Sequence, residues 1–346
     1  MKILMLGASY GSLLSTKLLM AGHDVTLICR EQTAELINSK GTFVRIKLRD
    51  EAEHRVIHSD ALPGNVDALT PVDARPEDYD MVGLAMQEPQ YGSDAVKALM
   101  SRVAASRKPC LSIMNMPPLP YLKRIKALAD IPLDSCYADP SVWEGFEPGL
   151  MSLCSPDPQA FRPPEEKPNV LHVGLPTNFK AAEFADSAHN EMLRKLEKDI
   201  SDVRLDGQDV PVKLRVFQSL FVPMAKWSML LTGNYRCILQ DREQAIRDAV
   251  HGDLEASGAI YAWVDSVSRK IGADPADQVP FQKYAKAAES LLKPSSAARA
   301  IGSGVSQIER VDRLVRTIAA HVGMQNDAVD RIVATVDARL AANATG

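Results

Sequence analysis

A short glycine-containing turn near the start of the chain holds the first residues with a recognisable chemistry. Residues 7–12 read GASYGS and stand between an apolar run and a helical pattern. Small residues there let the backbone bend sharply, let a pyrophosphate approach, and point amide donors of the helix N-terminus at it. Ser9 replaces the second glycine of the GxGxxG spacing, and Gly11 comes one residue early. We expect a dinucleotide-binding turn whose cofactor contacts come from Gly7, Ser9, Tyr10, Gly11 and Ser12; a plain tight turn of another α/β fold is the alternative.

The end of the second apolar run distinguishes the two nicotinamide cofactors. NAD-binding chains usually place an Asp or Glu there for the ribose hydroxyls, whereas NADP-binding chains tend to place an Arg for the 2′-phosphate. Here the run ends in Cys29-Arg30-Glu31. The guanidinium of Arg30 can hold a phosphate through two parallel hydrogen bonds. We expect NADPH rather than NAD, with a solvated surface charge as the alternative role of Arg30 and a ribose contact open to Glu31.

A parallel sheet is needed to position these residues, and the first half of the chain has its pattern. Four apolar runs are typical of buried parallel strands, and helical patterns lie between them. The runs cover residues 2–6, 24–29, 80–84 and 110–114. This alternation predicts a Rossmann-type, doubly wound parallel sheet. Asn115 follows the last run, at the carboxyl edge where such sheets bind ligands, so we expect it to contact cofactor or substrate unless it only forms a turn.

The pattern changes in the middle of the chain. Residues 132–176 are rich in proline and hold short apolar segments, which predicts an antiparallel addition and then a boundary. From about residue 211 the three-to-four spacing of apolar residues predicts helices almost only. The sequence therefore predicts two domains, an NADP-binding Rossmann-type domain over 1–178 and an all-α-helical domain over 179–346.

Composition excludes several classes of protein. The 346 residues carry a formal charge of −4, so no basic excess drives general binding to nucleic acid or to a membrane surface. No apolar run is long enough to span a bilayer. The five cysteines are scattered and form no CxxC or Cys/His cluster, which supports neither a disulfide framework nor a metal site. We expect a cytoplasmic protein that binds a small-molecule substrate, with no metal, nucleic acid or membrane partner.

The opening segment MKILMLGASYGS…AGHDVTLICR resembles that of the ketopantoate reductases (2-dehydropantoate 2-reductases). Further likeness lies in short motifs along the chain: IMNM at 113–116, VLHVG at 170–174, KWSMLL at 226–231, PSS at 294–296 and SQIE at 306–309. The resemblance implies a Rossmann domain joined to an all-helical domain, and reduction of a 2-oxo acid by NADPH between them. It also implies that Asn115 and Gln87 lie at cofactor-binding positions, and that Ser295 and Gln307 lie at substrate-binding positions.

Several polar positions of that family are changed in this chain. The family's general-acid lysine falls at Met229, and two asparagines that follow it fall at Gly233 and Cys237. Its substrate-binding glutamate falls at Gln307, and a lysine after its third main strand falls at Gln87. The apolar pattern and the order of elements are kept. The inference of the fold therefore stands, whereas the specific reaction does not transfer.

Hydride transfer to a carbonyl needs an acid to protonate the developing alkoxide. Lys226 lies three residues before Met229, near the same helix face, and is our candidate acid; a solvated lysine is the alternative. Asn234 is next to Gly233, and a one-residue shift would restore the family's amide for catalysis. Its alternative role is a helix cap, because Gly and Asn commonly end helices.

Two further candidates lie near the end of the chain. Ser295 follows Pro294 and fits a helix N-cap as well as it fits a substrate contact. The neutral amide of Gln307 can still bind a hydroxyl or carboxylate. Glu309 is expected to be a solvated or ion-paired surface residue.

These observations predict an NADPH-dependent oxidoreductase that reduces a small 2-oxo acid or a related carbonyl compound, or runs the reverse reaction. An opine-type dehydrogenase, which reduces an imine formed from a 2-oxo acid and an amine, is a close variant. The rival from another class is a non-catalytic NADP-binding redox sensor, which the changes at Met229 and Gln307 favour. The helical domain offers a surface through which a homodimer could form.

Overall fold

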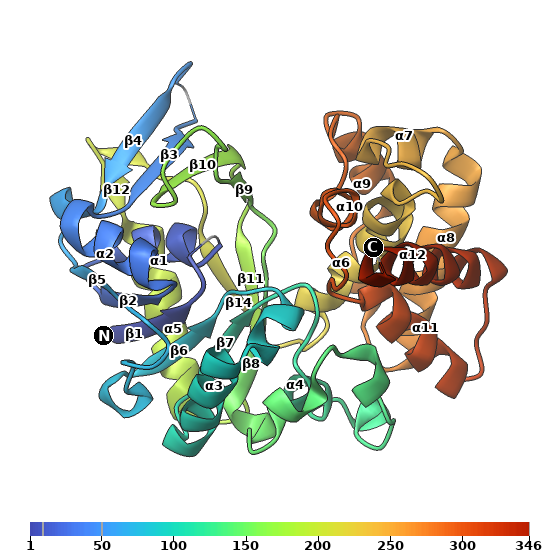
Figure 1. Cartoon of the computed structure of the whole chain (residues 1–346), viewed down its shortest axis with the longest axis horizontal. Helices are drawn as coiled ribbons and strands as arrows, with labels where there is room; N and C mark the ends of the chain where they lie inside the picture. Colours follow the sequence, from blue (N-terminus) through green and yellow to red (C-terminus); the bar gives the residue numbers. More distant parts are fainter. Residues whose placement is uncertain (9, 50, 346) are drawn as a thin grey trace. The chain divides into compact units, whose positions relative to one another are not determined.

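A computed structural model describes residues 1–8, 10–49 and 51–345, with Tyr10 described by its backbone. The chain divides into two compact units (Figure 1). The first unit contains residues 1–86, 90–121 and 141–218. The second contains residues 87–89, 122–140 and 219–346.

An eight-stranded sheet forms the centre of the first unit, in the order β14-β11-β8-β7-β6-β1-β2-β5. The six strands from β8 to β5 are parallel, while β11 and β14 run together in the opposite direction. The strands are β1 Lys2–Leu6, β2 Asp24–Ile28, β5 Val66–Leu69, β6 Met81–Leu84, β7 Cys110–Ile113, β8 Met151–Ser155, β11 Phe179–Ala182 and β14 Leu214–Phe217. Because β11 and β14 complete one edge of this sheet, the first unit extends to Gln218.

The expectation of helix from residue 211 is wrong at β14. Leu214 and Val216 are buried, whereas Arg215 between them is exposed. This alternation has the period of a strand, and β14 pairs in parallel with β11 along its whole length.

The sheet winds in two directions from β1. β2 pairs with one side of β1, and β6 pairs with the other. Because crossovers between parallel strands are right-handed, α1 (Tyr10–Met20) and α3 (Asp94–Ser106) cover opposite faces of the sheet (Figure 1). The predicted fold class, a Rossmann-type doubly wound sheet followed by a helical part, is confirmed. Such a reversal of strand order beside β1 is where doubly wound sheets bind ligands.

Helix α1 is buried on most of its surface. Its four leucines, at positions 13, 14, 18 and 19, are at most 2% exposed. The side chain of Lys17 is also buried, and its Nζ donates a hydrogen bond to the carbonyl of Val210 at 3.2 Å. Burial lowers the pKa of Lys17 to about 7.

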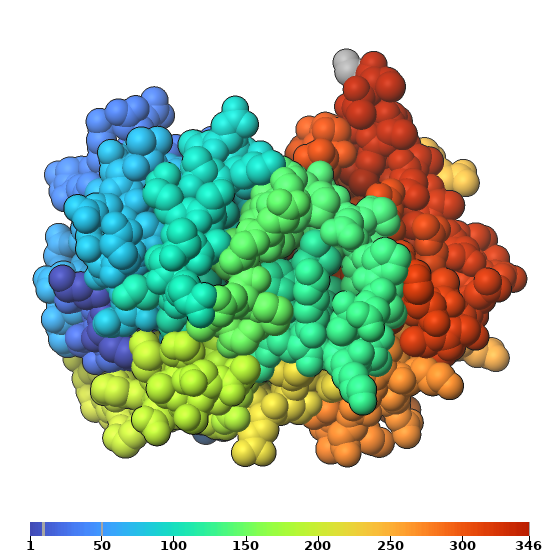
Figure 2. All heavy atoms as spheres, turned by 90° about the horizontal axis from the view of Figure 1, so that it is seen from below, coloured from blue at the N-terminus to red at the C-terminus, as the bar shows by residue number. Residues whose placement is uncertain are grey.

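Two further helices complete the layers of this unit, α2 Glu31–Lys40 and α5 Ser187–Asp202. α5 contacts α1, and its outer face forms part of the surface shown in Figure 2, in yellow-green. Asp186 precedes α5, and its carboxylate accepts hydrogen bonds from the backbone N–H groups of Ala188 and His189. This is an N-cap, which satisfies amides that have no partner within the helix.

A second sheet of the first unit has four strands in the order β4-β3-β10-β9. They are β3 Phe43–Lys47, β4 His54–His58, β9 Gln159–Phe161 and β10 Val170–Leu175. β9 and β10 form an antiparallel hairpin, and β10 pairs in parallel with β3. The proline-rich region therefore supplies both β8 of the main sheet and this hairpin. A small hairpin, β12 Arg204–Leu205 and β13 Gln208–Asp209, lies between α5 and β14.

The second unit is helical. Its helices are α6 Lys226–Met229, α7 Ile246–His251, α8 Leu254–Lys270, α9 Phe281–Ala288, α10 Ser296–Gly302, α11 Val311–His321 and α12 Asp327–Thr345, and the short α4 Leu119–Leu122 borders it in sequence. Helix begins again only at Val311 after α10, and α11 ends before Gly323, whose φ is 74°. Among the described residues, no helix is both long and apolar enough to cross a bilayer.

A buried ion pair stabilises the start of α11. Arg310 donates two hydrogen bonds to the carboxylate of Asp312, at 2.9 and 2.8 Å, and a third to Asp337 at 2.5 Å. Asp312 is fully buried and Arg310 is 6% exposed. Burial alone would lower the pKa of Arg310, but the two carboxylates raise it above its usual range. Removing one partner of such a pair leaves the other charge buried and uncompensated.

Asp312→Ala should destabilise the helical unit by about 2–4 kcal/mol, slightly less than the usual cost because Asp337 still faces Arg310. The double variant Arg310→Met/Asp312→Leu should recover most of this loss, since it leaves no unpaired buried charge at the pair itself. Urea unfolding followed by circular dichroism measures both effects. A loss below about 1 kcal/mol in the single variant would contradict the assignment.

Candidate functional site

Gly7 joins the ends of three strands. Its N–H donates to the carbonyl of Ile28 at the end of β2, at 3.2 Å. Its φ is 101°, and a Cβ at this position would lie 2.6 Å from the carbonyl oxygen of Ala85, just after β6. Both the conformation and the contact exclude a side chain. The turn after β1 is therefore held against the carboxyl ends of β2 and β6.

Gly11 lets the first turn of α1 approach the sheet closely. A Cβ there would lie 2.8 Å from Cγ of Met5. The hydroxyl of Ser12 is turned back into the loop and donates to the carbonyl of Ala8 at 2.5 Å. Ser12 thus braces the turn, while the predicted contact at Ser9 and the side chain of Tyr10 lie outside the described parts of the structure.

Arg30 stands at the end of β2 and precedes the first turn of α2. It is exposed and has an extended backbone, with φ −67° and ψ 150°. Its guanidinium makes no hydrogen bond or ion pair with the residues that the structure describes. Its neighbour Cys29 is half-buried, and burial raises the pKa of this thiol to about 11. The contact of Arg30 with a 2′-phosphate stays a prediction.

Arg162 was not predicted from the sequence, and it contacts the turn after β1. It follows β9, and its Nη2 donates to the carbonyl of Ala8 at 2.9 Å. Its charge lowers the pKa of Cys29 against the larger effect of burial. Burial in turn lowers the pKa of Arg162 itself. No local signal marks this arginine, because its place depends on how the β9–β10 hairpin folds onto the first residues of the chain.

Two predicted cofactor contacts follow neighbouring strands of the main sheet. Asn115 comes two residues after β7 and is half-buried between the buried Met114 and Met116. Gln87 comes three residues after β6 and is exposed. Asn115 belongs to the first unit and Gln87 to the second.

Lys226, Met229 and Asn234 share one face of a helical segment in the second unit. All three are half-buried, whereas residues 230–233 between the last two are buried. The reason is a π turn over Leu230–Asn234, in which the N–H of Tyr235 donates to the carbonyl of Leu230, five residues earlier. Residues five apart share a face in a π turn. Asn234 therefore takes the place that Gly233 would take in an α-helix.

Tyr284 fixes the register of this turn. Its hydroxyl donates to the carbonyl of Met229 at 3.1 Å. A Cβ on Gly233 would lie 2.0 Å from the same hydroxyl oxygen, so only glycine fits there. The π turn thus places Asn234 on the same face as Met229, and a role of its amide in catalysis stays a prediction. The amide of Asn234 makes no hydrogen bond with the described residues, which leaves it free to bind a ligand.

Ser295 lies beside this segment, and its hydroxyl is fully used. It donates to the carbonyl of Asn234 at 2.7 Å and accepts from the N–H of Ala298 at 3.1 Å, as the N-cap of α10. Ser295 is 3% exposed. Gln307 is exposed in the non-helical segment before α11, and none of its contacts joins it to Ser295.

Glu88 is a buried carboxyl group that the sequence analysis missed. It is 3% exposed, and both carboxylate oxygens accept from the N–H of Ala138, at 3.1 and 3.2 Å. Its own N–H donates to the carboxylate of Glu309 at 3.4 Å, so Glu309 is a half-buried neighbour rather than an exposed surface residue. Burial raises the pKa of Glu88 to about 7, and the Glu309 charge adds to the rise against the lowering by Ala138. A carboxyl group with such a pKa can donate a proton near neutral pH. Its place four residues after β6 puts it near the carboxyl end of the sheet, but its burial depends on Ala138 and Glu309, which are distant in the sequence.

Comparisons with known proteins identify the architecture. No family model matches this sequence, and no curated protein does either. Solved structures match over nearly the full length. A 2-dehydropantoate 2-reductase from Methylococcus capsulatus has a TM-score of 0.67 at 13% identity, covering 96% of this chain and 95% of that one. The chain has the ketopantoate reductase fold.

Two other structures of this fold add to the comparison. A D-mandelate dehydrogenase, solved with NADH and anilino(oxo)acetate, has a TM-score of 0.66 at 14% identity and covers 99% of this chain and 100% of that one. A dimeric ketopantoate reductase from Staphylococcus aureus has a TM-score of 0.63 at 10% identity, with coverage of 99% and 100%. The resemblance predicted from the motifs is thus confirmed as a likeness of fold.

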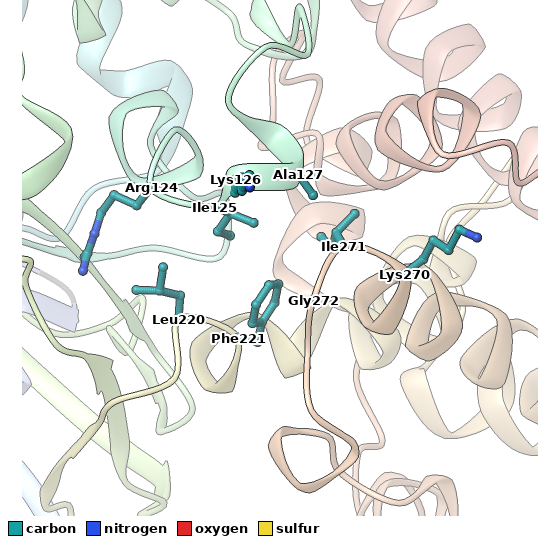
Figure 3. A pocket seen from close by; sticks show the side chains of 9 residues that line it. All are labelled: Arg124, Ile125, Lys126, Ala127, Leu220, Phe221, Lys270, Ile271 and Gly272. Carbon is teal, nitrogen blue, oxygen red and sulfur yellow. The ribbon is translucent and has the colours of Figure 1, made fainter.

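A pocket of the helical unit contains none of the site residues that the ketopantoate reductase resemblance implies. It has a volume of about 590 Å³ and lies between the 3₁₀ turn at Lys126 and the end of α8. Figure 3 shows Ile125, Phe221 and Ile271 near its centre, while Arg124 and Lys270 extend away from it. None of the candidate acids lines it. Across the described residues, no group of three His, Cys, Asp or Glu side chains is placed to hold a metal ion.

Glu88 should make the stability of the protein fall as pH rises from about 4.5 to about 7, since its pKa is raised to about 7 in the folded state. In this window the folded state binds the proton more tightly than the unfolded state does. Because Gln does not titrate, the free energy of unfolding of Glu88→Gln should rise relative to that of wild type by roughly 1 kcal/mol for each pH unit across this window. Urea unfolding at pH 5 and pH 7 measures this, and the exposed Glu255→Gln is the control. The same pH dependence in wild type and Glu88→Gln would show that Glu88 titrates normally.

Proposed function

We propose that this protein is an NADPH-dependent oxidoreductase that reduces a small 2-oxo acid or a related carbonyl compound. The observation that carries the proposal is the turn after β1, where Gly7 and Gly11 leave no room for a Cβ. A backbone cradle of this kind, at the strand-order reversal of a doubly wound sheet and at the N-terminus of α1, is suited to a pyrophosphate. The ketopantoate reductase fold supports the class of reaction.

The residues of the first unit fit a dinucleotide cofactor. The cradle would hold the pyrophosphate, and Arg30 lies at the end of β2 with no partner among the described residues. We propose NADPH over NADH, because a guanidinium at this position suits a 2′-phosphate. The dehydrogenase of the same fold that was solved with NADH makes NADH the comparison to test.

The proton step is assigned to the second unit. When bound, a reduced nicotinamide supplies hydride to the carbonyl carbon. We propose that the ammonium of Lys226 donates a proton to the carbonyl oxygen, and that the amide of Asn234 orients the substrate. Both side chains lie on the face created by the π turn. Glu88 is the second candidate acid, because the pKa of its buried carboxyl group is about 7.

A non-catalytic NADP-binding sensor is the second candidate function. Met229, which cannot transfer a proton, occupies the face on which Lys226 and Asn234 lie. Loss of NADPH absorbance with a panel of aliphatic and aromatic 2-oxo acids separates an enzyme from a sensor. We also propose a homodimer, as in the dimeric ketopantoate reductase of the same fold.

Arg30→Ala should weaken NADPH binding by about 10–100-fold, because a charge-assisted contact to the 2′-phosphate is lost. NADH binding should change by less than about threefold, since NADH lacks that phosphate. Titration calorimetry of both cofactors measures the two effects. Arg75→Ala, at an exposed arginine of the same unit, is the matched control. Equal losses for NADPH and NADH would show that Arg30 does not read the phosphate.

Lys226→Met should lower turnover by about 10²–10⁴ and leave NADPH affinity nearly unchanged, which is the usual effect of removing a general acid. Glu88→Gln and Met229→Lys are the comparison variants, assayed with the same 2-oxo acid. If Lys226→Met has a small effect and Glu88→Gln a large one, the proton comes from Glu88. New activity in Met229→Lys together with inactive wild type would favour the sensor.

A further inference from the structure

Arg162 is a half-buried cation beside the candidate cofactor turn. It is the first residue after β9 and lies 154 residues along the chain from Ala8, whose carbonyl its Nη2 contacts at 2.9 Å. The same carbonyl accepts the hydroxyl of Ser12. The second sheet therefore places a guanidinium directly against the β1–α1 turn.

The hydrogen-bonding capacity of this guanidinium is not satisfied within the described chain. Its Nε is buried and has no hydrogen-bond partner there. Arg162 also forms no ion pair with any described carboxylate, whereas Arg45 on the adjoining strand β3 pairs with Glu166 of the same hairpin loop at 2.5 Å. Burying an N–H donor without a hydrogen-bond partner is costly. A bound anion would supply both the hydrogen-bond acceptor and the negative charge that the guanidinium lacks.

The position of Arg162 indicates which part of a ligand it meets. Its charge acts on the thiol of Cys29, at the end of β2, and it also contacts the turn after β1. In dinucleotide-binding sheets, the adenosine ribose lies between the first turn and the end of the second strand. Two arginines from distant parts of the chain therefore lie near this thiol. Arg30 is the next residue in the sequence, and the charge of Arg162 reaches the thiol through the fold.

We propose that Arg162 binds the 2′-phosphate of NADPH together with Arg30 and thereby selects NADPH over NADH. This inference rests on the proposed function, because it assumes that the first unit binds a nicotinamide dinucleotide. Arg30 is exposed and directly precedes α2, whereas Arg162 is half-buried and contacts the turn after β1. Two guanidinium groups provide more donors than one, in a fork geometry that suits phosphate oxygens.

The test is titration calorimetry of wild type and Arg162→Gln with four probes: NADPH, NADH, 2′,5′-ADP and ADP-ribose. Arg162→Gln should weaken NADPH and 2′,5′-ADP by at least about tenfold, and should change NADH and ADP-ribose by less than about threefold. Arg162→Lys should lie between, because it keeps the charge without the fork. In a double-variant cycle with Arg30→Ala, the two losses should be less than additive if both side chains hold one phosphate.

Arg45→Gln is the matched control, because it removes an arginine that anchors the same hairpin loop through Glu166 without touching the turn. It should leave NADPH affinity within about threefold of wild type, and thermal melting should show both variants folded. Equal weakening of NADPH and NADH by Arg162→Gln would overturn the proposal and assign Arg162 to the pyrophosphate or to the shape of the turn. Unchanged NADPH binding, or an equal loss in Arg45→Gln, would overturn it as well. Wild type that binds neither cofactor would instead overturn the proposed function.

Discussion

The carboxyl end of β1 is the point on which the first unit depends. At Gly7 the chain leaves β1 with a positive φ, donates to the end of β2 and passes the carbonyl of Ala85 so closely that no side chain fits. Three strand ends and the N-terminus of α1 thereby meet within the reach of one small molecule. The hydrophobic core beneath this junction, formed by β1 and the leucines of α1, holds it in place. The exposed arginine after β2 and the half-buried arginine after β9 can act on one ligand only because this junction is fixed.

Charge is divided between the two units in a way that suits two different tasks. Around its glycine turn, the first unit presents cations, Arg30 and Arg162, which suit phosphate. The second unit instead buries the carboxyl group of Glu88. Both of its oxygens accept from the N–H of Ala138, and the nearby carboxylate of Glu309 accepts from the backbone N–H of Glu88. Burial has opposite consequences in the two places, because an arginine stays charged while a carboxyl group takes up a proton. The former suits an anion-binding site and the latter suits proton transfer.

Local patterns in the sequence were enough to predict the elements that surround the glycine turn. The run at Lys2–Leu6, the helix after it and the run at Asp24–Ile28 each have a clear period and a turn between them. The strand β14 was missed because its four residues lie within a longer stretch of helical spacing. Arg162 and Glu88 could not be found in this way. Their environments arise from pairing of β10 with β3 and from the loop at Ala138, which are contacts between distant parts of the chain.

The π turn at Leu230–Asn234 also affects how this chain is to be compared with others. A π turn holds one residue more than an α-helical turn in the same rise of chain, so it acts as a one-residue insertion that leaves both flanking helical segments in place. If this chain is matched to one with only α-helical turns in this segment, a count forward from Trp227 therefore places every residue after the π turn one position out of step. The polar side chain that next shares the face of Met229 is then Asn234, whichever residue a count of four would name.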